Sequence, residues 1–134
     1  MPFICPHLRT LEEQAIASGD TCVALIRSSV PGLRGTSPSG WRQGAPVVGG
    51  ARIARGTAIA TFDNGRYANR QGFDHAAIFL EYAGTGIWVL EQRPGSAQGT
   101  VQRSFIAGGH AGSDGEFSNP GNMAAAFSVI ELHA

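Results

Sequence analysis

The pattern of apolar residues changes near residue 56, and this change limits the folds open to the chain. Before it, apolar residues recur at helical spacing in two short segments; after it, short apolar runs alternate with turn residues, as strands do. Five runs have strand character: GTAIATF, HAAIFLEY, GIWVLEQ, TVQRSFI and AAAFSVIEL. The tight turn at residues 83–86 joins the second and third runs as an antiparallel hairpin. Helices followed by an antiparallel meander predict an α+β fold, with N-terminal helices packed on the sheet.

The two helices are placed by their caps. The sequence TLEE, from Thr10, fits a capping box at the start of the first helix. Asp20 is the predicted N-cap of the second helix, CVALIRSS, which ends before Pro31. Residues 31–50 are rich in glycine, proline and serine and are predicted to be mainly loop, with a short helical turn beginning at Trp41.

Composition narrows the class of protein. The 134 residues, 43% of them hydrophobic, predict a single folded domain over residues 1–134. The net charge is zero, so we expect no nucleic-acid partner. No apolar run is long enough to cross a bilayer, and the N-terminal residues lack a signal-peptide pattern. We therefore expect a protein made in the cytoplasm, without a membrane partner.

Three side chains carry the candidate chemistry. Cys22 opens the second helix, where the helix-start amides favour a thiolate. His75 opens one strand and Glu91 closes the next, and in the hairpin His75 comes opposite residues 91 to 92. A shift of one residue decides whether Glu91 or Gln92 reaches the imidazole. A thiol, an imidazole and a carboxylate in this order are typical of a thiol hydrolase, in which histidine carries the proton and the carboxylate orients the ring.

Each of these residues also has a structural interpretation. A cysteine such as Cys22, taken alone, is more often a small buried apolar residue than a nucleophile. A lone histidine opening an apolar strand is usually structural too. Glu91 ends the apolar run GIWVL, so it needs either a partner or a route to solvent. The order of the three residues favours the catalytic interpretation.

Other polar and aromatic residues are given lesser roles. Asp74 points to the opposite strand face from His75 and is predicted to serve a turn. Arg66 and Tyr67 line either a substrate groove or a solvated loop. Cys5 is expected to lie in a mobile terminus. A disulfide between Cys5 and Cys22 is not expected, because it would consume the thiol of the candidate nucleophile. Trp41 and Trp88 are expected in the core. The histidines and cysteines show no metal-ligand spacing, so neither a metal nor another cofactor is expected.

The same motifs resemble the CHAP and NlpC/P60 amidases. The strand GHVAIVE and the later EQN of CHAP domains correspond to DHAAIFLE at residues 74–81 and EQR at residues 91–93. Those families are papain-like cysteine peptidases that cleave peptidoglycan peptides. The resemblance implies a papain-like fold, with Cys22 as nucleophile, His75 as base and Glu91 as third member. Arg93 stands where CHAP domains carry asparagine.

The chain resembles family two of the type VI secretion amidase effectors more closely. The supporting motifs are CVALIRSSVP, WRQGAPV, GTAIATFDNGRY and HAAIFL, within residues 20–92. The resemblance implies an antibacterial toxin, secreted without a signal peptide, that cuts the peptidoglycan peptide in the periplasm of a target bacterium. It also implies two protein partners: a component of the secretion machinery and a cognate immunity protein that inhibits the site.

Two further functions stay open at the level of sequence. The same thiol and imidazole serve acyl transfer when an amine replaces water on a papain-like scaffold. Alternatively, the chain is a non-catalytic interaction module in which Cys22 is simply packed.

Overall fold

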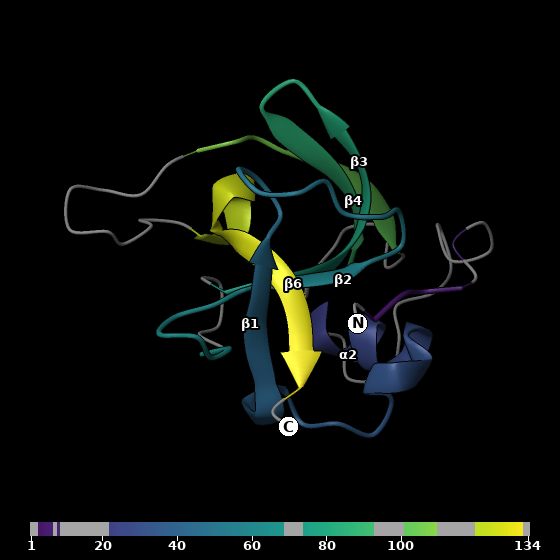
Figure 1. The fold of residues 1–134 in the computed structure, drawn as a ribbon. Helices are drawn as coiled ribbons and strands as arrows, with labels where there is room; N and C mark the ends of the chain where they lie inside the picture. Colours follow the sequence, from purple (N-terminus) through teal and green to yellow (C-terminus); the bar gives the residue numbers. More distant parts are fainter. Residues whose placement is uncertain are drawn as a thin grey trace.

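A single six-stranded antiparallel sheet, with one helix against it, organises the part of the chain that the structure describes (Figure 1). This computed structural model describes residues 3–6, 8, 22–68, 74–92, 101–109 and 120–132. The helix is α2 (Cys22–Ser29), and the strands are β1 (Trp41–Pro46), β2 (Ala58–Thr61), β3 (Ala76–Ala83), β4 (Gly86–Glu91), β5 (Gln102–Ile106) and β6 (Phe127–Leu132). Short 3₁₀ turns span Pro31–Leu33, Pro38–Gly40, Pro120–Asn122 and Ala124–Ala126. The predicted α+β fold is confirmed.

The strand order is β1-β6-β2-β3-β4-β5. The predicted meander is present from β2 to β5, where each strand pairs with the next along the chain. The last strand departs from it, because β6 lies between β1 and β2 and pairs with both. Figure 1 shows β1 and β6 side by side.

The hairpin of β3 and β4 has the predicted turn and an irregularity that the sequence did not reveal. Ala83 pairs with Gly86, so two residues form the turn. A bulge between Phe79 and Glu81 then shifts the register by one residue, and Ile78 lies opposite Leu90. The bulge determines which side chains meet at the open end of the hairpin.

The prediction of a loop over residues 31–50 is wrong in one part, because Trp41–Pro46 is a strand. Trp41 is fully buried, and its indole N–H donates to the hydroxyl of Thr36 at 3.1 Å. Arg42 and Gln43 pair with β6 at the edge of the sheet. The strand ends at Pro46, which has no backbone N–H to donate, and an edge strand tolerates this because it pairs on one side only. The helical turn lies just before Trp41, at Pro38–Gly40.

Apolar side chains cover both faces of the sheet in two clusters. We call the first the helix-side cluster: it joins Val23, Leu25 and Ile26 of α2 to Trp41, Ile78, Leu90 and Ile130 of the strands. The far-side cluster lies on the other face and contains Ile59, Ala77, Phe79, Ile87, Val89 and Phe127. Strand alternation explains the division, because successive residues of each strand point to opposite faces.

The N-terminal segment departs from its prediction. Cys5 is buried in the helix-side cluster, and its backbone N–H donates to the carbonyl of Gly56 at 2.8 Å. The expected mobile terminus is therefore wrong at Cys5, and neither Cys5 nor Cys22 forms a disulfide. The predicted caps at Thr10 and Asp20, and Arg93 of the EQR motif, lie outside the described residues.

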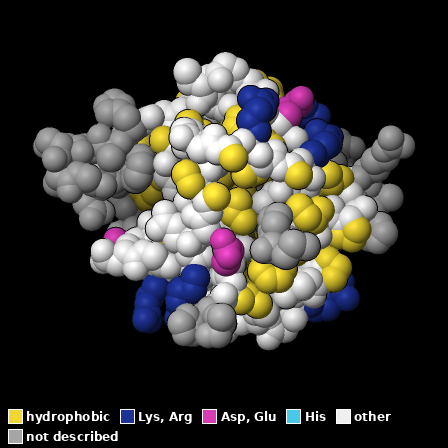
Figure 2. Space-filling model, viewed as in Figure 1, with side chains coloured by type: hydrophobic (Ala, Val, Ile, Leu, Met, Phe, Trp, Pro, Cys, Tyr) yellow, Lys and Arg dark blue, Asp and Glu magenta, His cyan; other side chains and the backbone are white. Residues whose placement is uncertain are grey.

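Figure 2 shows one face of the described surface. In Figure 2, apolar side chains gather over the middle of the face in view, with arginines nearer its rim. No described histidine is visible on this face. Within the described segments, no helix has the length and apolar character needed to cross a membrane.

Candidate active site

Cys22 is the first residue of α2. Its side chain is partly exposed and packs against the helix-side cluster through its apolar surface. At this position the first N–H groups of the helix have no intrahelical partner, and the positive end of the helix dipole favours a negative charge. Helix α2 therefore presents a thiol where a thiolate is stabilised.

His75 and Glu91 meet at the open end of the hairpin. His75 immediately precedes β3, and Glu91 is the last residue of β4. His75 Nε2 lies 2.8 Å from Glu91 Oε1, and the two residues are only 3% and 6% exposed. Burial of this depth strengthens a hydrogen bond to a carboxylate, because water does not compete for either partner.

The bulge explains why Glu91, rather than Gln92, reaches the imidazole. Counting on from Ile78 opposite Leu90 places Glu91 beside Ala77 on the far-side face. His75 lies two residues before Ala77, just outside β3, so it meets Glu91 diagonally, whereas a regular hairpin was predicted to bring the two directly opposite. The His75 ring also packs edge-on against Phe127, with centroids 6.3 Å apart.

The imidazole perturbs the thiol. Burial alone would raise the pKa of Cys22, but the hydrogen bond and charge of His75, followed by the hydroxyl of Tyr67 and the backbone N–H of Ala76, lower it below its ordinary value of 9.0. The three predicted side chains, Cys22, His75 and Glu91, thus form one continuous thiol–imidazole–carboxylate series. Such a series can generate a thiolate and move its proton.

Tyr67 is a site residue whose place the sequence indicated only vaguely. Its hydroxyl lies 3.6 Å from Cys22 Sγ, and the residue is 5% exposed. Burial, and then the charge of Cys22, raise the pKa of Tyr67 far above its ordinary value of 10.0. The phenol therefore keeps its proton. The alternative of a solvated loop is wrong for Tyr67, although Arg66 beside it is exposed.

Asp74 is more than a turn residue. It is 8% exposed, and its carboxylate accepts a hydrogen bond from the hydroxyl of Thr61 at 3.0 Å. Its negative charge contributes to the raised pKa of Tyr67, which places the carboxylate close enough to act on that phenol. The prediction of a simple turn role is wrong because Asp74 is enclosed on the sheet beside β2.

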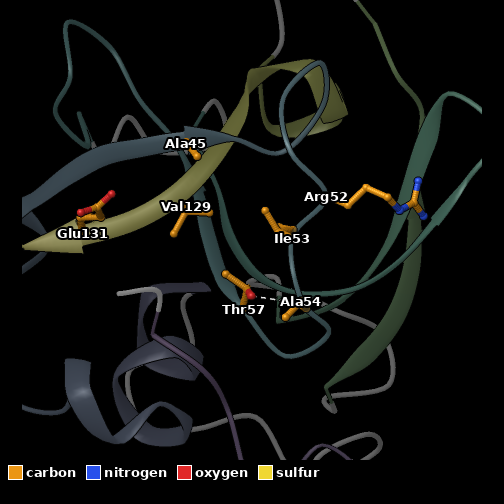
Figure 3. Close-up of a pocket in the computed structure, with 7 residues that line it drawn as sticks. All are labelled: Ala45, Arg52, Ile53, Ala54, Thr57, Val129 and Glu131. Atoms are coloured by element: carbon orange, nitrogen blue, oxygen red, sulfur yellow. Dashed lines mark hydrogen bonds between the residues drawn. The ribbon is translucent and has the colours of Figure 1, made fainter.

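A separate pocket of about 250 Å³ lies away from these residues (Figure 3). Its walls come from β1, β6 and the segment before β2, and its lining residues are Ala45, Arg52, Ile53, Ala54, Thr57, Val129 and Glu131. Figure 3 shows the Arg52 side chain directed away from the pocket, and its guanidinium lies over the Tyr82 ring at 4.3 Å. The pocket contains none of the thiol, imidazole or carboxylate groups of the candidate site.

Among the described residues, no group of three or more histidine, cysteine, aspartate or glutamate side chains is placed to hold a metal ion. His75 is engaged by Glu91 through Nε2.

Comparison with known proteins assigns the chain to a family. The sequence model of the domesticated amidase effector 2 family matches residues 2–119. A type VI secretion amidase effector 2 protein from Salmonella typhi is 36% identical over 136 residues, which cover 98% of this chain and all of that protein. Domesticated amidase effector 2 from Ixodes scapularis is 38% identical over 72 residues, covering 53% of this chain and 49% of its own. The solved structure of a type 6 secretion amidase effector 2 has a TM-score of 0.88 and 34% identity, and covers all of this chain and 97% of its own. The chain belongs to the domesticated amidase effector 2 family of cysteine amidases and has the papain-like α+β fold of the type VI secretion effectors within it.

Proposed function

We propose that this protein, over a single domain of residues 1–134, hydrolyses amide bonds in the peptides of bacterial peptidoglycan. In this proposal Cys22 is the nucleophile, His75 the general base and acid, and Glu91 the group that orients the imidazole. The observation that carries it is the buried 2.8 Å contact between His75 Nε2 and Glu91 Oε1, with the thiol of lowered pKa beside the same ring. Relatives named as amidase effectors support the reaction class.

The proton path follows from the hydrogen bonds of the ring. An ionised Glu91 carboxylate can only accept a hydrogen bond, so in this proposal Nε2 carries the ring proton and Nδ1 takes the proton of Cys22. The thiolate attacks the amide carbonyl, and the backbone N–H of Cys22 at the helix start supplies a donor for the resulting oxyanion. The imidazolium then returns the proton to the leaving amine. A thioester remains on Cys22, and water deprotonated by His75 hydrolyses it.

Digestion of purified sacculi tests this mechanism. We expect the wild-type protein to release muropeptides whose masses correspond to addition of one water across an amide bond. Cys22→Ala should abolish release while leaving the folded state intact, as judged by circular dichroism. The matched control is Cys5→Ala, which removes the other thiol. Cys5 is only 3% exposed and has no part in the proposed mechanism, so this variant should keep the wild-type activity.

Two results would contradict the proposal. Cleavage by Cys22→Ala at the wild-type rate would exclude Cys22 as the nucleophile. Products that carry a transferred amine in place of water would instead assign the chain to acyl transfer.

The name of the Salmonella relative also supports a route of delivery. We propose that a type VI secretion machine carries this protein into the periplasm of a target bacterium, and that a cognate immunity protein protects the producer. Expression directed to the periplasm of a Gram-negative host should lyse the cells, whereas cytoplasmic expression should not. Lysis that persists with Cys22→Ala would show that another activity is responsible.

A further inference from the structure

We infer that the Tyr67 hydroxyl is a second side-chain hydrogen-bond donor to the Cys22 thiolate, beside His75, and that it extends the active nucleophile to lower pH. The inference rests on the proposed role of Cys22. It adds a catalytic residue outside the Cys22, His75 and Glu91 series, from a segment between β2 and β3.

The position of Tyr67 is fixed from both sides. The preceding turn at Asn64 and Gly65 has two successive residues with positive φ, 52° and 79°. Asp63 and Arg66 exchange both backbone hydrogen bonds across this turn, at 2.8 and 3.0 Å, so the chain leaves it in a defined direction. The Tyr67 ring then packs against Trp41, with centroids 5.4 Å apart. A buried ring held by a tight turn and by the core places its hydroxyl reproducibly.

The direction of the hydrogen bond between Tyr67 and Cys22 depends on which of the two atoms carries a proton. Oη and Sγ are 3.6 Å apart, and either atom can donate when both carry protons. Once the Cys22 proton has passed to His75, sulfur has no proton left and can only accept. Tyr67 retains its proton because burial and the neighbouring negative charges disfavour the phenolate. Tyr67 is therefore the donor in the state that attacks the substrate.

The charged groups around the thiol act in a consistent sense. His75 approaches Cys22 from the start of β3, with Glu91 of β4 behind it. The backbone N–H of Ala76 also points to the sulfur. The charge of Asp74 acts on Tyr67, and its carboxylate accepts a hydrogen bond from Thr61 of β2. Burial, then the charge of Cys22 and lastly that of Asp74 raise the pKa of Tyr67 and keep the phenol protonated, whereas His75 and Tyr67 both favour the thiolate.

The test removes one oxygen atom and follows the thiol directly. Tyr67→Phe keeps the ring against Trp41 and deletes Oη. Tyr82→Phe is the matched control, because it also removes a tyrosine hydroxyl but one that does not contact the site. The Tyr82 hydroxyl donates to the Val47 carbonyl at 2.7 Å and accepts from the Ile53 N–H at 3.2 Å. The rate of iodoacetamide alkylation is measured against pH on the peptide that contains Cys22, which separates it from Cys5.

We expect Tyr67→Phe to move the alkylation midpoint upward by about one pH unit, the size of one hydrogen bond to a charged group. At a pH well below both midpoints, alkylation should then be about tenfold slower than in the wild type. Tyr82→Phe should leave the midpoint unchanged. The acid limb of kcat/KM on sacculi should move in the same direction as the alkylation midpoint, with little change in KM. A purely structural role would lower the plateau without moving the midpoint.

A second measurement covers the case in which Tyr67→Phe fails to fold. The chain has two tyrosines, so difluorotyrosine incorporated into Tyr82→Phe labels position 67 alone. The more acidic phenol is a stronger donor and should move the Cys22 midpoint downward. An unchanged midpoint in both experiments overturns the inference, whatever the activity on sacculi. If the midpoints move but the wild-type protein leaves the sacculi intact, Tyr67 is confirmed as a hydrogen-bond donor and the proposed function is wrong.

Discussion

The contact between His75 and Glu91 supports the sharpest quantitative prediction. The side chains are only 4% and 8% exposed, so little solvent screens the 2.8 Å hydrogen bond. Glu91→Gln retains an acceptor for Nε2–H but removes the charge that stabilises the imidazolium. A hydrogen bond to a charged group contributes about 1 to 1.5 kcal/mol more than a neutral one, which corresponds to about a tenfold loss of kcat/KM. Glu91→Ala removes the acceptor altogether and should cost about 10- to 150-fold.

The assay is the initial rate of muropeptide release from sacculi at several substrate concentrations. Glu81→Gln provides a matched control, because this carboxylate lies on the same hairpin but forms an exposed ion pair with Arg103. We expect Glu81→Gln to retain the wild-type rate. If both Glu91 variants stay within about twofold of wild type, the reasoning is refuted. A larger loss from Gln92→Ala than from Glu91→Ala would give the orienting role to Gln92.

Three further predictions concern stability and its dependence on pH. The pKa of Cys22 is lowered in the folded state, so its ionisation stabilises the fold above the ordinary value of 9.0, and this contribution is lost as the pH falls through the lowered value. In urea unfolding at a series of pH values, the free energy of unfolding of Cys22→Ser should lack this dependence on pH. Parallel plots of that free energy against pH for the wild type and Cys22→Ser would contradict the prediction. Gly86→Ala should destabilise the protein, measured as a lower Tm, because the added Cβ would overlap the Ile106 carbonyl oxygen of β5; an unchanged Tm would mean that β5 yields freely. Phe127→Ala should lower the free energy of unfolding by about 3–5 kcal/mol, because the ring is fully buried; a loss below about 1 kcal/mol would show that the space collapses.

Local patterns in the sequence predicted most elements, and the reasons are visible in the structure. The runs around Ile59, Ile78 and Val89 became strands because each has apolar residues for both faces of a covered sheet. Residues 41–46 were missed because an edge strand with polar residues lacks that signal. Its one strong apolar residue, Trp41, was correctly expected in the core.

The sequence predicted three side chains that lie together at the candidate site, but not the geometry of their contacts. Sequence order indicated Cys22, His75 and Glu91, because helix starts and strand ends have recognisable signatures. The choice between Glu91 and Gln92 depended on a bulge between Phe79 and Glu81, and no local residue pattern specifies that bulge. Tyr67 reaches Cys22 across 45 positions of the chain, a contact that only the assembled sheet creates.

The place of β6 also dictates when the protein can be completed during synthesis. A nascent chain that has emerged only as far as residue 126 has β1 and β2 but not the strand that joins them. It also lacks Phe127, against which the His75 ring packs. Because this contact spans so much of the chain, it closes late, after the local hairpins have formed. The Cys22 thiol and the His75 imidazole thus emerge well before the last strand docks, and for that interval the His75 ring lacks its packing partner Phe127.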